Sequence, residues 1–276
     1  MNELRMLADW LPSVVKIASD AGALIMPFFK SAPEMMCARQ KDDRSLVTRA
    51  DLAAHELIMT RLIDLTPSLP VLSEEGANVS LERRQSWQTY WLIDPLDGTR
   101  GFVAGSPDFT VNIALIHKGA PVLGVVYSPV TAISYYAFRG GGAFKKDHQS
   151  DPSRLRVRTL DWSAYCVLLG HYSTTPAARR TCEKQPGCTL RQLNSSIKFM
   201  HIADGLADFY PRWGKTSEWD TAASQCVLEE AGGLVLDLAG NSLHYNGRAS
   251  LINPPFVAVG DQSDVDAILA WVLRCQ

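Results

Sequence analysis

The chain has 276 residues, of which 46% are hydrophobic and 20% are charged. This balance is typical of a globular protein, and the length allows one large or two medium domains with a substantial core. The net charge of −2 excludes a general attraction to nucleic acid or to an anionic membrane, so an anionic ligand must be held by a metal ion or by a few placed cations.

The cysteines and the apolar segments indicate neither a disulfide framework nor a membrane span. The six cysteines form no Cys-x-x-Cys pair, so we expect free thiols in a reducing cytosol. No stretch approaches the roughly 18 consecutive apolar residues of a transmembrane segment, and Asp9 and Asp20 interrupt the apolar residues of the N-terminus, unlike a secretory leader. We predict a cytoplasmic protein; peripheral association with the cytoplasmic face of the inner membrane, and a monomeric or homodimeric state, stay open.

The first half of the chain is expected to place helices on an antiparallel sheet. Residues 4–29 carry apolar side chains at helical spacing, and a second helix is predicted for residues 51–63. Thr48 and Asp51 stand where side-chain oxygens can cap the free N–H groups of that second helix. The predicted strands of this half are residues 71–72, 90–93, 109–116, 122–127 and 133–138.

The second half alternates strands with helices, which predicts a mostly parallel sheet and an α/β class. The polar stretch 145–158 is the predicted boundary between an N-terminal α+β domain, residues 1–150, and a C-terminal α/β domain, residues 151–276. The predicted strands are residues 165–169, a segment near Leu190, 207–210 and 234–238, and the predicted helices are residues 176–183, 196–203, 221–231 and 263–273.

The segment Asp-Pro-Leu-Asp-Gly-Thr, residues 94–99, follows a predicted buried strand. Asp94 at the end of such a strand is costly unless it is paired or binds a metal. Asp97 lies one turn further on, so the two carboxylates and the carbonyl of Leu96 can converge as the hard oxygen ligands that Mg²⁺ prefers. Gly98 allows close approach of the backbone to a ligand, and a helical turn starting near Thr99 would direct free N–H groups at an anion. The alternative is a solvated Asx turn, which Asp-Gly often forms.

Three more acidic segments favour the metal interpretation. Glu74 and Glu75 end the short strand 71–72, Asp51 opens a helix, and Asp220 opens another helix in the second half. Taken singly, the glutamates could be a solvated pair and Asp220 an ordinary helix cap. Taken together, they supply enough carboxylates for two or three metal ions in a cleft between the halves.

These residues make the sequence resemble the inositol monophosphatase superfamily of lithium-sensitive, metal-dependent phosphatases. Its signature is a Glu-Glu pair, then Asp-Pro-(Ile/Leu)-Asp-Gly-Thr, then Trp-Asp-x-Ala-Ala, and the match runs from the first helix to Pro254. The resemblance implies a layered αβαβα sandwich and two or three Mg²⁺ ions. It implies that the metal ligands are Glu74, Asp94, Leu96 (through its backbone oxygen), Asp97 and Asp220.

The same resemblance assigns the water-activating and substrate-contacting groups. It pairs Thr99 with Asp51 to orient and activate the attacking water, which Glu74 also holds, without a covalent phosphoenzyme. The backbone and side chains of the signature also contact the substrate phosphate; these residues are Leu96, Asp97, Gly98, Thr99 and Asp220.

Several segments are similar to the CysQ-type 3′(2′),5′-bisphosphate nucleotidases; they are residues 73–75, 90–99, 109–116, 210–212 and 251–254. This similarity implies a small nucleotide substrate: the enzyme would remove the 3′-phosphate of adenosine 3′,5′-bisphosphate, a by-product of sulfur assimilation, and leave AMP. The second phosphate then needs cations of the protein. The resemblance points to four residues, His171, Ser195, Lys198 and Arg212, each of which could by itself be a loop histidine, a helix cap or a solvated cation.

Two departures from the subgroup pattern bear on substrate preference. Leu46 stands where the subgroup usually has proline, which would loosen the loop ahead of Asp51. Asn194 stands where it usually has glycine; asparagine can adopt a positive φ at some cost, which would keep the turn, but the change could reshape the pocket for the base. The alternative functions are an inositol or sugar monophosphatase and a non-catalytic nucleotide or metal sensor; an intact pair of Asp51 and Thr99 argues against the sensor.

Overall fold

The structure is a computed structural model that describes residues 3–31, 39–40, 46–77, 79–147, 149–172, 174 and 176–275. Cys37, the loop 41–45 and the side chain of Leu46 lie outside the described residues, so the free thiol expected at Cys37 and the looser loop expected from Leu46 stay predictions. The other five cysteines are free thiols, as predicted; they are Cys166, Cys182, Cys188, Cys226 and Cys275.

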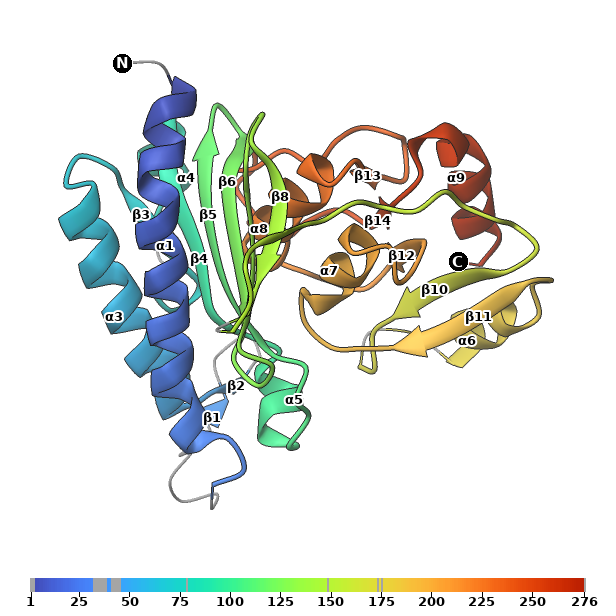
Figure 1. Cartoon of the computed structure of the whole chain (residues 1–276), viewed down its shortest axis with the longest axis horizontal. Helices are drawn as coiled ribbons and strands as arrows, with labels where there is room; N and C mark the ends of the chain where they lie inside the picture. Colours follow the sequence, from blue (N-terminus) through green and yellow to red (C-terminus); the bar gives the residue numbers. More distant parts are fainter. Residues whose placement is uncertain are drawn as a thin grey trace.

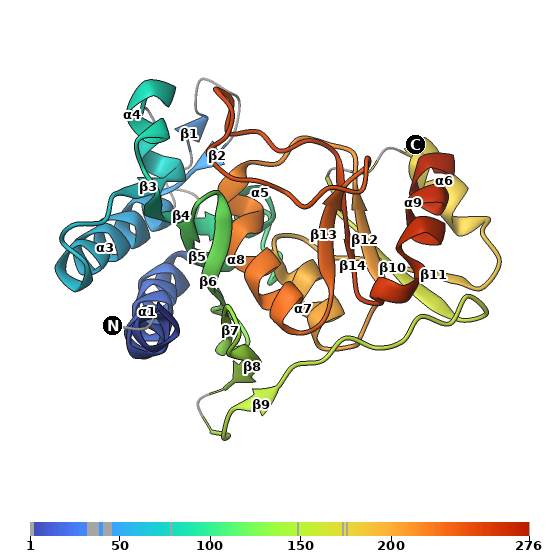
Figure 2. The ribbon, with the colours of Figure 1, turned by 90° about the horizontal axis from the view of Figure 1, so that it is seen from above.

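The described helices alternate with two sheets in five layers (Figures 1 and 2). α1 and α3 form the first layer, α7 and α8 lie between the sheets, and α6 and α9 cover the far side. The helices are α1 (Glu3–Ile25), α3 (Arg49–Leu65), α4 (Leu81–Gln85), α5 (Thr99–Val103), α6 (Pro176–Glu183), α7 (Ile197–Ala203), α8 (Glu218–Glu230) and α9 (Val265–Arg274), with 3₁₀ turns at Met26–Phe28, Glu74–Gly76 and Gln262–Asp264. The predicted αβαβα sandwich is confirmed.

Within the described residues, the strands form a first sheet of seven strands, a second sheet of five and a small two-stranded ladder. The first sheet has the spatial order β3 (Val71–Ser73), β4 (Thr89–Asp97), β5 (Thr110–His117), β6 (Ala120–Ser128), β7 (Ile133–Phe138), β8 (Gly142–Lys146) and β9 (Ser153–Arg154). The second sheet has the order β11 (Cys188–Gln192), β10 (Tyr165–Leu169), β12 (Phe209–Arg212), β14 (Phe256–Val259) and β13 (Leu234–Asp237). The ladder pairs β1 (Arg39–Gln40) with β2 (Leu46–Val47).

The central strands β4, β6, β10 and β14 are buried along nearly their whole length because both faces of each sheet are covered there. In β4, Trp91 and Ile93 pack on the side of α1 and α3, whereas Tyr90 and Leu92 pack on the side of α7 and α8. Successive side chains of a strand point to opposite faces, so one run of apolar residues serves two cores. A third core lies between the second sheet and the outer helices, where Trp271 of α9 is 2% exposed.

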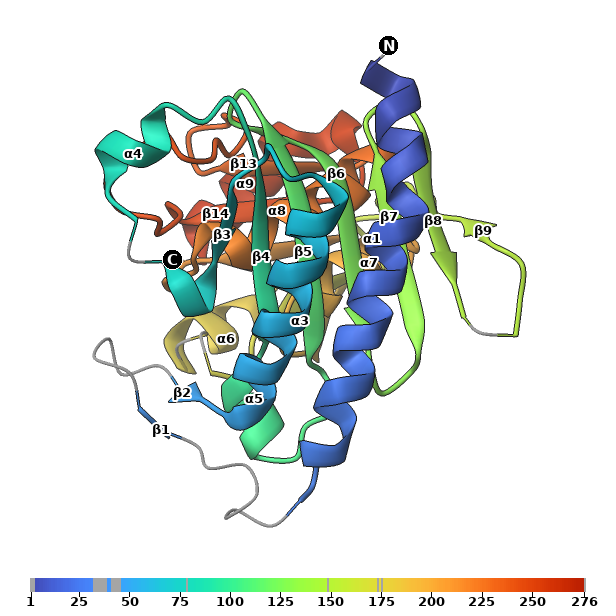
Figure 3. The same cartoon turned by 90° about the vertical axis from the view of Figure 1, so that its left-hand side faces the viewer.

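Helix α1 covers the first sheet beside α3 (Figure 3). By length and mean hydropathy of 1.2 alone, the segment Leu4–Phe28 could cross a membrane. Its apolar stripe, however, is used in the core: Leu7, Val14 and Ile25 are at most 1% exposed. The apolar stripe of α1 is therefore explained by its packing on the sheet. The absence of a transmembrane segment stays a prediction.

The second sheet differs from the mostly parallel sheet that was predicted. β10 pairs in parallel with β11 and β12, but β14 runs antiparallel to both β12 and β13. A parallel return needs a crossover connection, usually a helix, and the described chain between β13 and β14 contains none. β14 itself was not among the predicted strands.

The two halves of the chain share one core. α8, from the second half, packs against β5 and β6 of the first sheet, and β9, beyond residue 150, extends that sheet by pairing with β8. The division into domains near residue 150 stays a prediction. This arrangement brings the start of α8 to the ends of β3 and β4.

Candidate active site

Glu74 and Asp94 are neighbours because their strands are parallel neighbours. β3 pairs with β4 in a register that sets Ser73 opposite Ile93, so Glu74 and Asp94, the next residues along the chain, follow side by side where β3 ends and β4 continues. The β4–β5 ladder is irregular between Asp94 and Asp97, where the strand bends out of register. The Leu96 N–H donates to Asp94 Oδ1 at 3.0 Å and holds this turn in shape.

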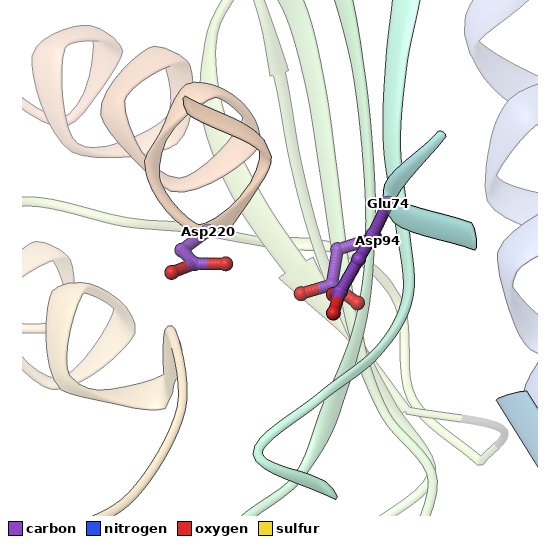
Figure 4. Close-up of side chains that lie close together, drawn as sticks. All are labelled: Glu74, Asp94 and Asp220. Atoms are coloured by element: carbon purple, nitrogen blue, oxygen red, sulfur yellow. The ribbon is translucent and has the colours of Figure 1, made fainter. Parts of the chain in front are cut away.

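Asp220 joins them from the second half of the chain. It is the third residue of α8 and completes a capping box in which the Ser217 N–H donates to Asp220 Oδ2 at 2.9 Å. Carboxylate oxygens of Glu74, Asp94 and Asp220 lie within 4.8 Å of one another, with Asp220 facing the other two (Figure 4). Asp220 is therefore a helix cap, as its position predicted, and the same side chain lies where it could also bind a metal.

The electrostatics of this cluster favour a cation. Burial, followed by repulsion from Glu74, raises the pKa of Asp94 well above its usual 3.8. Burial and the charges of Asp97 and Glu74 do the same to the pKa of Asp220. Buried carboxylates are stable as anions only with a counter-charge, and three oxygen donors so close together suit Mg²⁺ by number and hardness. The residues present therefore fit the divalent metal that the sequence implies.

Asp97 lies beside the three-carboxylate cluster and connects it to the second half. Its Oδ2 accepts the Ser196 N–H at 2.5 Å and the Asn112 side-chain amide at 3.5 Å. Burial raises the pKa of Asp97, while the positive charge of Lys198 acts against that rise. Asn112 was not predicted as a site residue, although a single amide within the apolar run of β5 is the signal that could have identified it.

Thr99 and Asp51 form the predicted pair. Thr99 is the first residue of α5, as expected, and its Oγ1 lies 3.1 Å from both Asp51 Oδ1 and the Leu96 carbonyl. The other oxygen of Asp51 accepts the Thr48 N–H at 2.8 Å and the Thr48 hydroxyl at 2.5 Å, which confirms the predicted cap. Asp51 is 2% exposed, and burial raises its pKa to about 6.

Gly98 is needed for backbone conformation. Its φ is +96°, in the left-handed region, and a Cβ atom would lie 3.1 Å from the Asp108 carbonyl oxygen. The turn that presents Asp97 and Thr99 to the same space therefore requires glycine at this position.

The carboxylates line one wall of a cleft of about 530 Å³. Among the predicted site residues, Asp51 stands behind the wall, and the others line the cleft; they are Glu74, Asp94, Leu96, Asp97, Gly98, Thr99, His171, Ser195, Lys198, Arg212 and Asp220. The structure thus brings residues from both halves of the chain together around one space.

The two predicted cations, Lys198 and Arg212, form a cationic wall of the same cleft. Lys198 Nζ donates to the Ser195 carbonyl at 2.5 Å and lies 4.9 Å from the centre of the Tyr210 ring. Burial lowers the pKa of Lys198 to about 7. The Arg212 guanidinium donates to the carbonyls of Gly214 at 3.0 Å and Lys215 at 2.5 Å, which fixes its orientation.

The loop before α7 corrects the expectation for Asn194. The positive φ lies at Ser195, at 49°, and not at Asn194. Asn194 instead packs inward, where its side-chain amide donates to Ser106 Oγ at 3.0 Å and its backbone N–H to Asp108 at 3.3 Å. The turn is kept because Asn194 anchors the loop and Ser195 takes the left-handed conformation.

A buried network missed by the sequence reasoning holds the start of α8. The Arg84 guanidinium, from α4, donates to Asn246 Oδ1 at 2.6 Å and to the Ala249 carbonyl at 3.0 Å. The Asn246 N–H in turn donates to Glu218 Oε2 at 2.8 Å. Glu218 is two residues from Asp220, so α4 helps to position the Asp220 carboxylate near those of Glu74 and Asp94. No local pattern in the sequence distinguishes the buried Arg84 from the adjacent Arg83, which is exposed.

Comparison with known proteins agrees with this geometry. Residues 6–267 match the family model described as the inositol monophosphatase family. The proteins named 3′(2′),5′-bisphosphate nucleotidase CysQ from Salmonella typhimurium and Escherichia coli K12 are 42% and 40% identical, each over 89% of this chain and 98% of the relative. The crystal structure of CysQ from Bacteroides thetaiotaomicron superposes with a TM-score of 0.77 at 32% identity, covering 91% of this chain and 96% of that one. An IMPase from Thermotoga maritima gives 0.82 at 26% identity, covering 97% and 98%.

Proposed function

The chain belongs to the inositol monophosphatase family, and we propose that it is a 3′(2′),5′-bisphosphate nucleotidase that hydrolyses adenosine 3′,5′-bisphosphate to AMP and phosphate. The observation that carries this proposal is the pairing of two walls in one cleft. A cluster of Glu74, Asp94 and Asp220 lines the same cleft as the cationic wall of Lys198 and Arg212. One wall suits a metal-bound phosphate, and the other suits a second phosphate.

We further propose Mg²⁺, as two or three ions, as the cofactor. The ligands would be Glu74, Asp94, the Leu96 carbonyl, Asp97 and Asp220. When bound, the metal supplies positive charge to the phosphate oxygens and lowers the pKa of water.

Thr99 and Asp51 would orient the attacking water. The Thr99 hydroxyl has one proton, which it donates to Asp51 or to the Leu96 carbonyl at 3.1 Å. Its lone pairs are then left to accept a hydrogen bond from water. Because Asp51 is held by Thr48 and buried, the pair is fixed before substrate arrives, as efficient proton transfer requires.

The cationic wall would hold the 5′-phosphate away from the metals. Lys198 and Arg212 are fixed by hydrogen bonds to carbonyl groups, so their charges are positioned in advance. Ser195 and His171 line the same cleft and would complete the phosphate contacts. We place the enzyme in the cytoplasm, where sulfur assimilation would form its substrate, as a monomer or homodimer.

A substrate panel tests the proposal. Purified protein with Mg²⁺ is expected to release phosphate from adenosine 3′,5′-bisphosphate faster than from inositol 1-phosphate, with AMP as the product and with inhibition by Li⁺. Faster turnover of inositol 1-phosphate would assign the chain to the monophosphatases of the family. No turnover of any substrate would favour a sensor, and full activity of an Asp94→Asn variant would contradict the proposed role of Asp94.

A further inference from the structure

Tyr172 is an aromatic side chain that lines the cleft and yet is open to solvent. It is 53% exposed, whereas the other aromatic residues of the lining, Phe199, Tyr210 and Phe256, are at most 2% exposed. An exposed aromatic ring in a concave site is a common feature of ligand recognition, because its apolar faces are stabilised when a ligand covers them.

The position of Tyr172 is set by the second sheet. It follows β10, which pairs in parallel with β11 so that Leu169 lies opposite Gln192. The chain leaves both strands at the same edge, and the loop after β11 carries Ser195 and leads to Lys198. Tyr172 therefore belongs to the wall that is proposed to hold the 5′-phosphate.

Arg100 meets Tyr172 from the opposite half of the chain. It follows Thr99 in α5, lines the same cleft, and has its guanidinium carbon 5.5 Å from the centre of the Tyr172 ring. This cation–π contact orients the Tyr172 ring and places the flat guanidinium group of Arg100, which is also exposed, beside it. The pair therefore connects the start of α5, which carries Thr99, with the loop after β10.

We propose that Arg100 and Tyr172 form a stacking platform for the base of the nucleotide, which makes them specificity-determining residues. This inference rests on the proposed nucleotidase function. Any nucleotide base can stack on an aromatic ring or on a guanidinium plane, because every base has a π face. A purine has a larger π face than a pyrimidine. An inositol ring has hydroxyl groups and no π face, so the platform favours nucleotides over inositol phosphates.

The test compares ligands with and without a base. Wild type, Tyr172→Ala, Tyr172→Phe and a control, Leu206→Ala, are assayed with adenosine 3′,5′-bisphosphate and inositol 1-phosphate; Leu206 is 48% exposed and is not part of the cleft lining. Tyr172→Ala is expected to raise KM for the nucleotide about tenfold and to leave KM for inositol 1-phosphate within about twofold. Tyr172→Phe and the control are expected to match wild type.

Direct binding separates this inference from the proposed function. The dissociation constants of AMP and ribose 5-phosphate are measured by calorimetry in EDTA, where no turnover occurs. Tighter binding of AMP by wild type, lost in Tyr172→Ala, supports the platform even if hydrolysis of nucleotides fails. The platform is overturned if Tyr172→Ala weakens both ligands equally or neither, or if wild type binds AMP no better than ribose 5-phosphate.

Discussion

The Oγ1 atom of Thr99 lies 3.1 Å from Oδ1 of Asp51, although 48 residues separate them in the chain. The contact joins the first turn of α5 to the first turn of α3, at the edge where β4 ends. It places a hydroxyl and a buried carboxylate beside the metal-binding carboxylates proposed above, so the group that would hold water is built from two helix starts.

Removing the Thr99 hydroxyl tests this pair. Thr99→Val keeps the shape of the side chain and is expected to lower kcat about a hundredfold, the lower end of a positioned proton acceptor's contribution. Thr99→Ser keeps the hydroxyl and should retain most of the activity. Both are measured with adenosine 3′,5′-bisphosphate at saturating Mg²⁺; a Thr99→Val enzyme with the kcat of wild type would refute the role.

Asp94→Asn should separate activity from stability. We expect activity to fall more than about a hundredfold. Replacing a residue that only hydrogen-bonds to a metal ligand already lowers metal affinity or activity by roughly 10–100-fold, and Asp94 is proposed as a ligand itself. We also expect the melting temperature of the metal-free protein to rise, since the substitution removes a buried charge that Glu74 repels. Asp64→Asn, at an exposed position, is the matched control and should change neither quantity. Lower stability of Asp94→Asn in EDTA would contradict the electrostatic account.

The stability of the metal-free protein should depend on pH in a defined direction. Burial raises the pKa of Asp51 from 3.8 to about 6 and that of Glu218 from 4.5 to about 7. Both native-state values lie above the unfolded ones, so this contribution to the free energy of unfolding is complete below the unfolded values and is lost as pH rises through about 6 and about 7.

Mg²⁺ should counteract this loss of stability. In EDTA we expect the melting temperature to fall as the pH rises through the window from about 4 to about 7. The rise in melting temperature on adding Mg²⁺ should grow with pH, because Mg²⁺ competes with protons for Asp94 and Asp220. Differential scanning fluorimetry over the window, with and without Mg²⁺, measures both effects. A gain from Mg²⁺ that is equal at both ends of the window would count against a carboxylate metal site.

Loss of the Lys198 charge should make kcat/KM for the nucleotide fall on the alkaline side of its pH profile, which is called the alkaline limb. Burial lowers its pKa to about 7 in the free protein, so the charge that would attract the 5′-phosphate is lost as pH rises through that value. We expect kcat/KM for adenosine 3′,5′-bisphosphate to decline above about pH 7. Inositol 1-phosphate has no second phosphate and should lack this limb, as should Lys198→Met with the nucleotide. The same limb for both substrates would place its origin elsewhere.

Arg84 should be a stability residue that also supports metal affinity. It is 2% exposed, and Arg84→Ala leaves the Asn246 side chain and the Ala249 carbonyl without its donors. We expect a loss of about 3 kcal/mol in the free energy of unfolding, and weaker Mg²⁺ binding because α8 loses support near Asp220. Arg83→Ala, its exposed neighbour, is the control. Urea unfolding and Mg²⁺ titration measure the two effects, and equal behaviour of the two variants would refute the network.

The sequence by itself determined the chemistry and most of the elements. Glu74, Asp94 and Asp97 could be recognised as candidate metal ligands because each is a carboxylate at the end of an apolar strand. A charge is rarely buried beside a strand unless it is paired or binds a metal. Period-two and 3.6-residue patterns located the strands and helices, since local burial imposes those periods on the chain. The layered fold and the family followed from the motifs.

Only the tertiary structure decided which distant groups meet. Strand order depends on pairing between segments far apart, so no local pattern could show that β14 returns antiparallel. The exposure of Tyr172 beside Arg100, the positive φ at Ser195 and the support of α8 by Arg84 depend likewise on long-range packing. The residues that could bind a metal can be identified from the chain, but the cleft that they share with Lys198 and Arg212 is formed by the way the two sheets pack around α7 and α8.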